Sequence, residues 1–141
     1  MNSLSEQSDL GKVTDMPAYD DGNIFAKILR GEIPNSTVVE NDHALAFRDI
    51  APAAPSHVPV IPKGKYVTFR DFARKGSKEE HSAFVSAVAE VVEAEGLTED
   101  GYRLIVNNGP NGRQEVPHIH MHVLGGRDVG PMLKRWSKDE S

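Results

Sequence analysis

Three histidines, His118, His120 and His122, stand at alternate positions near the end of this 141-residue chain. They make up half of its six histidines. Because a β-strand sends successive side chains to opposite faces, this pattern predicts a strand with three imidazoles on one face, roughly 6.5 Å apart. The other face would hold Ile119, Met121 and Val123. A row of imidazoles can supply a nucleophile, a proton donor and a cationic surface for phosphate near neutral pH.

Two other interpretations of this row compete with catalysis. Packing alone gains nothing from repeating a polar group on one face. Zinc is a stronger alternative, because two histidines at positions i and i+2 and a third ligand such as His57 suit its geometry. Three same-face positions on an extended strand fit one ion poorly, since the outer pair would lie about 13 Å apart. We therefore expect neither a metal nor another cofactor.

The segment before the histidine row favours an anion. Gly109 and Gly112 predict a turn whose backbone N–H groups can approach a phosphate closely. Asn107 and Gln114 add neutral donors at its rim. Beside such a turn, one imidazole could attack phosphorus while a neighbour protonates the departing group.

The rest of the chain predicts an α+β fold with an antiparallel sheet, because strands follow one another without regular βαβ units. A capping box at Ser77–Glu80 and apolar residues at helical spacing predict the clearest helix, over residues 78–95. Other helices are expected over 24–30 and 68–74. Strands are expected near 37–40, 44–49, 57–61 and 102–107, with the histidine row last. Pro59 would place its strand at an edge of the sheet.

Composition limits the classes of protein. Hydrophobic residues make up 38% and charged residues 26% of the chain, which suits a soluble globular protein. No apolar run approaches the ~20 residues needed to span a bilayer, no secretory signal is visible, and there are no cysteines. These features fit a cytoplasmic protein without disulfides or thiolate sites. We expect no membrane partner.

Charge divides the chain into regions. Five of its 21 acidic residues lie in the first 23 positions, against one lysine. We expect residues 1–22 to form a disordered acidic arm, residues 23–131 a single domain and residues 132–141 a tail. The domain is almost neutral and has no basic stripe, which argues against binding of polymeric nucleic acid.

The histidine row and several ordered segments resemble the histidine triad (HIT) superfamily. Residues 118–124 match its H-φ-H-φ-H-φ-φ signature, where φ is apolar, and Gly125-Gly126-Arg127 favours the Hint branch, the purine nucleotide-binding phosphoramidases. The other matching segments are IFAKI (24–28), GEIP (31–34), AFRDI (46–50), PSH (55–57), VIPK (60–63), GYR (101–103), VN (106–107) and QEV (114–116). The resemblance implies a five-stranded antiparallel sheet with two helices, and a homodimer.

The resemblance also implies roles for individual residues. His120 would be the nucleophile that forms a nucleotidyl-histidine, and His122 would contact the α-phosphate and assist the leaving group. His118 and His57 would orient and polarise the row, and Asp49 would accept hydrogen bonds from the ribose. The base and ribose would contact Phe25, Ile28, Ile33, Phe47 and Ile50. The phosphate rim would comprise Asn107, Gln114, Glu115 and Val116.

The expected function is metal-free hydrolysis of the P–N bond of purine nucleoside phosphoramidates. Two alternatives stay open: a dinucleoside polyphosphate hydrolase, and a nucleotide-binding or protein-interaction module with incidental hydrolysis. The helix over 78–95 is expected to join the dimer, because its small residues would let a partner helix approach closely. Trp136, the only tryptophan, is expected to dock, either on its own protomer or beside the partner's nucleotide site.

Overall fold

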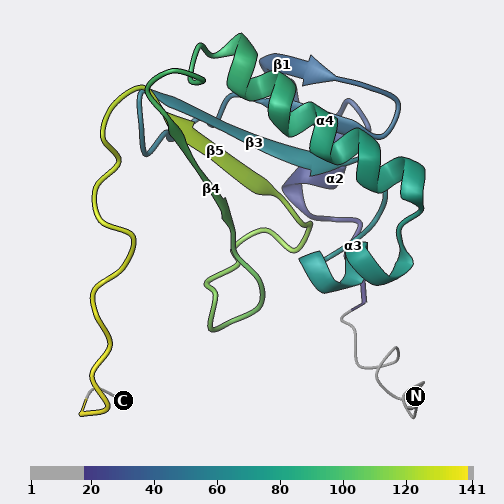
Figure 1. The fold of residues 1–141 in the computed structure, drawn as a ribbon. Helices are drawn as coiled ribbons and strands as arrows, with labels where there is room; N and C mark the ends of the chain where they lie inside the picture. The colour runs from purple at the N-terminus through teal and green to yellow at the C-terminus, as the bar shows by residue number, and fades with distance from the viewer. Residues whose placement is uncertain (1–17, 140–141) are drawn as a thin grey trace.

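A single sheet organises the computed structural model, which describes residues 18–139 (Figure 1). The strands lie in the order β1-β2-β3-β5-β4, and every neighbouring pair is antiparallel. This confirms the predicted fold. The strands are β1 (Thr37–Glu40), β2 (Ala44–Phe47), β3 (Ser56–Pro62), β4 (Tyr102–Val106) and β5 (Met121–Gly125).

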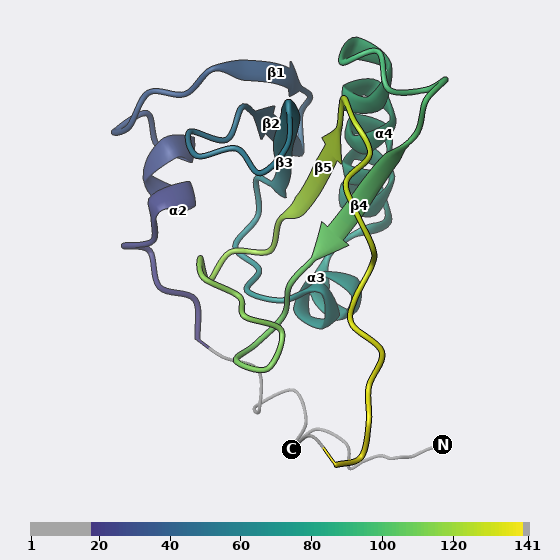
Figure 2. The same ribbon diagram turned by 90° about the vertical axis from the view of Figure 1, so that its left-hand side faces the viewer.

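Helix α4 (Lys78–Ala94) covers one face of the sheet (Figure 2). It begins at the predicted capping box, in which the Glu80 backbone N–H donates to Ser77 Oγ at 3.1 Å and the Ser77 N–H donates to Glu80 Oε1 at 2.8 Å. The buried face of the helix comprises Phe84, Ala87, Val88, Val91 and Val92. These side chains pack against the protein's own sheet, whereas Ala89 and Ala94 lie on the exposed part of the helix.

Helix α2 (Ile24–Leu29) lies on the opposite face (Figure 2). Its cap is Asn23, whose Oδ1 accepts from the Ala26 N–H at 2.9 Å. The two faces follow the alternation of side chains along β2: Ala44 and Ala46 join the core under α4, while Leu45 and Phe47 pack with α2. A third helix, α3 (Phe69–Lys75), agrees with the prediction over 68–74 and adds to the two helices that the resemblance implied.

The histidine row departs from the predicted strand. Strand β5 begins at Met121, so only His122 of the three lies in it. The preceding segment contains Pro117, which has no N–H to donate, and Ile119 donates its N–H to the carbonyl of Tyr66 at 2.9 Å. The predicted alternation nevertheless holds. The core under α4 takes Ile119, Met121 and Val123.

Strand β3 is central in the sheet rather than at its edge, which corrects the expectation from Pro59. This residue is in register with His122 of β5, whereas the register with β2 begins at Val60. The missing N–H of proline therefore falls just beyond the β2 pairing. Within residues 18–139, no helix is both long and apolar enough to cross a membrane.

Candidate active site

His120, the middle histidine of the row, has one ring nitrogen held by the backbone. Its side chain is 5% exposed, and its Nδ1 lies 2.8 Å from the carbonyl oxygen of His118. Because a carbonyl can only accept, the ring proton must be on Nδ1, which leaves a lone pair on Nε2. Burial lowers the pKa of His120, so this lone pair is available near neutral pH. These are the properties of a nucleophile.

His122 and His57 form a second hydrogen-bonded arrangement, in which the proton of His122 lies on Nε2 rather than on Nδ1. The Ala53 N–H donates to His57 Nδ1 at 3.0 Å, so the proton of His57 is on Nε2. His57 Nε2 lies 2.8 Å from His122 Nδ1 and donates to it. His122 therefore carries its own proton on Nε2. Burial, followed by the neighbouring His120 and His57, lowers the pKa of His122 to about 4.

The two reactive nitrogens belong to neighbouring rings. The ring centroids of His120 and His122 are 4.9 Å apart, and the planes meet at 80°. One ring thus offers a lone pair and the other an N–H group beside it. This pairing can attack an electrophilic atom and protonate the group that departs.

His118, the first histidine of the row, is completely buried and bound at both ring nitrogens. Its Nε2 donates to the carbonyl oxygen of Pro62 at 2.8 Å, and its Nδ1 lies 2.6 Å from the hydroxyl of Tyr19. Burial lowers its pKa to about 4. Tyr19 is not among the site residues predicted from the sequence, because residues 1–22 were assigned to the arm. The available signal was that Tyr19 is the only aromatic residue in that acidic region.

Asp49 faces the histidines from the end of β2. Its Oδ1 accepts from the Ala51 N–H at 2.9 Å, and its Oδ2 lies 3.5 Å from His57 Nε2. The carboxylate raises the pKa values of His57, His120 and His122, which burial lowers more strongly. Asp49 is therefore a turn residue and a local negative charge.

Asp49, His57 and His122 together could hold a metal ion, since each offers a ligand atom and these atoms lie within 4.8 Å of one another. A metal there would need the unprotonated nitrogens of both histidines. His57 Nε2 lies near both Asp49 Oδ2, at 3.5 Å, and His122 Nδ1, at 2.8 Å, so a metal bound through this nitrogen would displace its proton and the hydrogen bond to His122. Metal binding and this hydrogen bond are consequently mutually exclusive.

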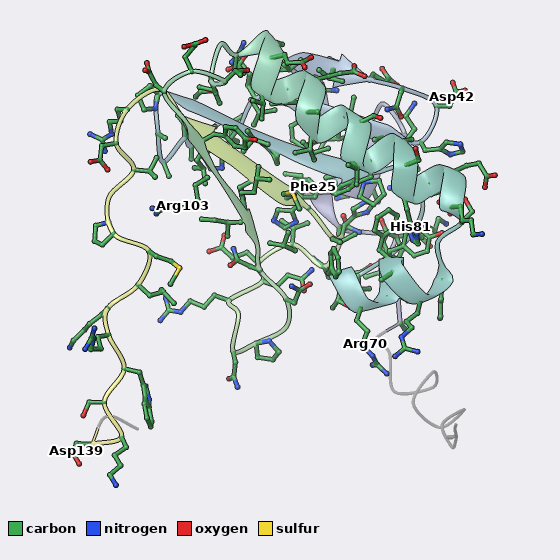
Figure 3. The ribbon with its side chains drawn as sticks, viewed as in Figure 1. Phe25, Asp42, Arg70, His81, Arg103 and Asp139 are labelled. Atoms are coloured by element: carbon green, nitrogen blue, oxygen red, sulfur yellow. The ribbon has the colours of Figure 1, made fainter. Side chains whose placement is uncertain are left out.

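Apolar side chains border the row on the α2 side. The ring of Phe25, labelled in Figure 3, meets His120 edge to face with centroids 4.9 Å apart, and it meets Phe47 at 5.5 Å. Ile50 differs from the others, since it is 95% exposed and lies outside this group. The structure brings four of the predicted base and ribose residues into one apolar group, together with Val116 of the predicted phosphate rim; the four are Phe25, Ile28, Ile33 and Phe47.

The loop before the row is built around Gln114. Its Nε2 donates to the carbonyl oxygens of Val67 at 2.6 Å and Val116 at 3.0 Å, and its Oε1 accepts from the Gly109 N–H at 3.0 Å. The side chain therefore organises the loop from within. A Cβ atom at Gly112 would lie 2.4 Å from the Asn108 carbonyl oxygen, so this tight turn requires glycine.

The two remaining rim residues differ in exposure. Asn107 is half-buried, whereas Glu115 is exposed. Glu115 is close enough for its charge to raise the pKa of His120.

Comparisons with known proteins agree with this geometry. The HIT domain model matches residues 30–129. The purine nucleoside phosphoramidase of Escherichia coli strain K12 is 47% identical over 110 residues, covering 78% of this chain and 92% of that protein. A 14 kDa zinc-binding protein of Zea mays is 40% identical over 127 residues, covering 90% and 95%. The crystal structure of a HIT family hydrolase from Legionella pneumophila superposes with a TM-score of 0.70 at 44% identity, covering 76% of this chain and 95% of that one. The chain therefore belongs to the HIT domain family.

Proposed function

We propose that this protein hydrolyses the P–N bond of purine nucleoside phosphoramidates through a nucleotidyl intermediate on His120. The observation that carries the proposal is that two neighbouring rings differ in the state of Nε2, which bears a lone pair in His120 and a proton in His122. The similarity to a protein named purine nucleoside phosphoramidase supports the substrate class.

The reaction would proceed in two displacements. Once His122 has taken up a second proton with the substrate, the Nε2 lone pair of His120 attacks phosphorus, the P–N bond breaks, and the amine leaves with the Nε2 proton of the charged His122, which returns to its neutral form. Water then attacks phosphorus, the bond from phosphorus to His120 breaks, and the proton of that water goes to His122. An anionic phosphoryl group favours the charged form of His122, so we expect the site to take up one proton with the substrate.

The surrounding residues would orient the nucleotide. We propose that the base and ribose contact the group around Phe25, with Ile50 at its exposed border, and that Asp49 accepts from the ribose hydroxyls. The loop containing Gly109 would present backbone N–H groups to the phosphate. Gln114 would act indirectly by holding that loop. The remaining residues proposed to border the nucleotide are Ile28, Ile33, Phe47, Asn107, Glu115 and Val116.

A substrate panel tests the proposal against its alternatives. We expect purine monophosphoramidates to be cleaved with higher kcat/KM than dinucleoside polyphosphates, and acid quenching to trap a nucleotide on His120 that mass spectrometry detects. Faster cleavage of dinucleoside polyphosphates would favour that hydrolase class. Tight binding of purine monophosphates in calorimetry, with no cleavage of any phosphoramidate, would favour a binding module.

Metal dependence needs its own test, because Asp49, His57 and His122 could hold an ion and one relative is named a zinc-binding protein. We propose a metal-free reaction, in which a chelator leaves turnover unchanged. Zinc should inhibit by displacing the hydrogen bond between His57 and His122. Loss of turnover with a chelator and its recovery with zinc would reject the metal-free mechanism.

We also propose that the protein is a homodimer. Strand β4 lies at an edge of the sheet, with Tyr102 and Leu104 exposed by 48% and 41% on the face that α4 occupies elsewhere. An edge strand with apolar side chains is a typical surface for association. Light scattering at micromolar concentration should give twice the mass of one chain, and a monomeric mass would contradict the proposal.

The tail, residues 132–141, is the second feature that favours a contact between protomers. It runs away from the rest of the chain (Figures 1 and 2), and Trp136 is 74% exposed, so docking on its own protomer is not observed. Arg103, labelled in Figure 3, donates to the carbonyl oxygen of Gly130 at 2.6 Å where the tail begins. We propose that the tail borders the partner's nucleotide site. Deleting residues 131–141 should then change the ranking of leaving groups by kcat/KM, and an unchanged ranking would discard the idea.

A further inference from the structure

Tyr19 contacts the histidine row from outside the part of the chain that matches the family, which begins at residue 30. Its hydroxyl lies 2.6 Å from His118 Nδ1, and the two rings meet edge to face with centroids 5.5 Å apart. This is the only side-chain hydrogen bond, among residues 18–139, that joins the segment before α2 to a histidine of the row.

The direction of this hydrogen bond follows from the other side of the His118 ring. His118 Nε2 faces the Pro62 carbonyl oxygen, which can only accept, so the ring proton is on Nε2. Nδ1 therefore accepts, and the Tyr19 hydroxyl donates. Burial raises the pKa of Tyr19, which keeps the hydroxyl protonated at neutral pH.

Three contacts hold the segment that carries Tyr19. Asp21 Oδ1 pairs with Lys65 Nζ at 2.8 Å, and its carbonyl oxygen accepts from Arg30 Nη1 at 2.8 Å. Asn23, the cap of α2, donates from Nδ2 to the Asp20 carbonyl oxygen at 2.8 Å. Residues 18–22, which the sequence analysis assigned to a disordered arm, are therefore bound to the domain. Residues 1–17 of that arm lie outside the described residues.

Tyr19 is connected to His120, the proposed nucleophile, through His118 alone. The backbone carbonyl of His118 accepts from His120 Nδ1, and this bond leaves the lone pair on His120 Nε2. A completely buried imidazole without a partner at Nδ1 would bear an unsatisfied acceptor. Without the Tyr19 hydroxyl the ring would be fixed only through Nε2, so the backbone carbonyl of His118 would be held less firmly against His120 Nδ1, and the neutral ring would lose one hydrogen bond.

We propose that Tyr19 is a positioning residue, which fixes the His118 ring with its proton on Nε2 and so holds the carbonyl that orients His120. Its role in turnover rests on the function proposed above. Its effect on His118 does not depend on any substrate.

The variant Tyr19→Phe tests this role, with Tyr66→Phe as the matched control, since the Tyr66 hydroxyl donates to Glu80 Oε1 at 2.8 Å and to no histidine. In long-range ¹H–¹⁵N spectra of the substrate-free protein, the Nδ1 resonance of His118 should move towards the position of a free lone pair in Tyr19→Phe alone. The pKa of His118, measured by titration in the same spectra, should rise.

Kinetics supply the second measurement. We expect Tyr19→Phe to lower kcat about 3- to 10-fold, the effect of one hydrogen bond, to change KM less than about 2-fold, and to move the acidic limb of the pH–rate profile to higher pH. Unchanged His118 resonances would overturn the proposal, as would altered resonances with unchanged kcat and pH profile. If the unaltered protein cleaves no phosphoramidate, the proposed function fails, while the spectra still decide whether Tyr19 controls His118.

Discussion

The site contains two hydrogen-bonded series, one that ends at the ring of His120 and one that ends at the ring of His122. They differ in whether the last ring presents a lone pair or an N–H group. In the first, the carbonyl of His118 binds the Nδ1 proton of His120, so the series ends on a lone pair. In the second, the N–H of Ala53 binds His57, which in turn donates to His122, so the series ends on an N–H group. The same side chain therefore presents a lone pair or an N–H group according to the backbone group at the start of its series.

The two series also differ in what connects them to the backbone. His120 binds a carbonyl directly and has a protein environment on most sides, since it is 5% exposed. His122 reaches the backbone only through the ring of His57, beside the carboxylate of Asp49. We infer that the first series is set by local chain geometry and that the second can gain and lose a proton during turnover.

Removing the end of the first series should have the largest effect. His120→Ala should lower kcat by on the order of 10⁴-fold or more, because it removes the nucleophile. Purine monophosphate should still bind in calorimetry. His43→Ala is the matched control, a histidine outside both series. Turnover in His120→Ala close to that of the unaltered protein would remove His120 as the nucleophile.

Removing the end of the second series should have an effect that depends on the leaving group. His122→Ala should lower kcat by roughly 10²- to 10⁴-fold for amines of high pKa, the usual contribution of a general acid. The loss should shrink for leaving groups that depart without a proton. A plot of log kcat against the pKa of the leaving group should therefore have a different slope for His122→Ala than for His120→Ala. Equal losses for every leaving group would contradict the assignment of His122 as the proton donor.

Acid should destabilise the buried first series. An imidazole in the unfolded chain binds a proton below about pH 6.5, whereas folded His118 does so only near its lowered pKa of about 4. Between these values the unfolded state binds more protons, so the free energy of unfolding should fall as the pH decreases from 6.5 to 4. The contribution of His118 should be about 3 kcal/mol.

Urea denaturation across this pH range measures that loss. The variant His118→Asn, which has no group that titrates there, should show a flatter dependence on pH. The same dependence in both proteins would show that His118 does not contribute.

Breaking the second series at its middle should have the smallest effect of the four. His57→Ala should lower kcat about 10- to 100-fold, the usual effect of a partner that orients a functional histidine. His57→Gln should retain more activity, because its amide can still donate to His122 Nδ1. Equal activity of the two variants would show that this hydrogen bond does not matter.

Much of this site could be predicted from the sequence. The alternation of residues 118–123 places the imidazoles on one face and the apolar residues on the other, and the structure confirms it. The motifs also predicted the family and the sheet. Local spacing is sufficient for these features, since they depend on neighbours along the chain.

Other features of the site could not be read from the sequence. The strand that was expected to carry all three histidines begins only at Met121, since Ile119 pairs with Tyr66 instead. Ile50 lies outside the apolar group, and Gln114 uses its amide to hold its own loop. For Ile119 and Gln114, a hydrogen bond with the remote segment at residues 66–67 decided the outcome.

The sequence by itself thus determined which side chains share a face and which family the chain resembles. Only the tertiary structure decided which nitrogen of each imidazole carries the proton. The carbonyl of Pro62, the N–H of Ala53 and the hydroxyl of Tyr19 come from separate segments. Backbone groups are the same in every residue except proline, so no residue type marks those that will face a histidine. Folding alone brings them there, and with them the chemistry of each ring.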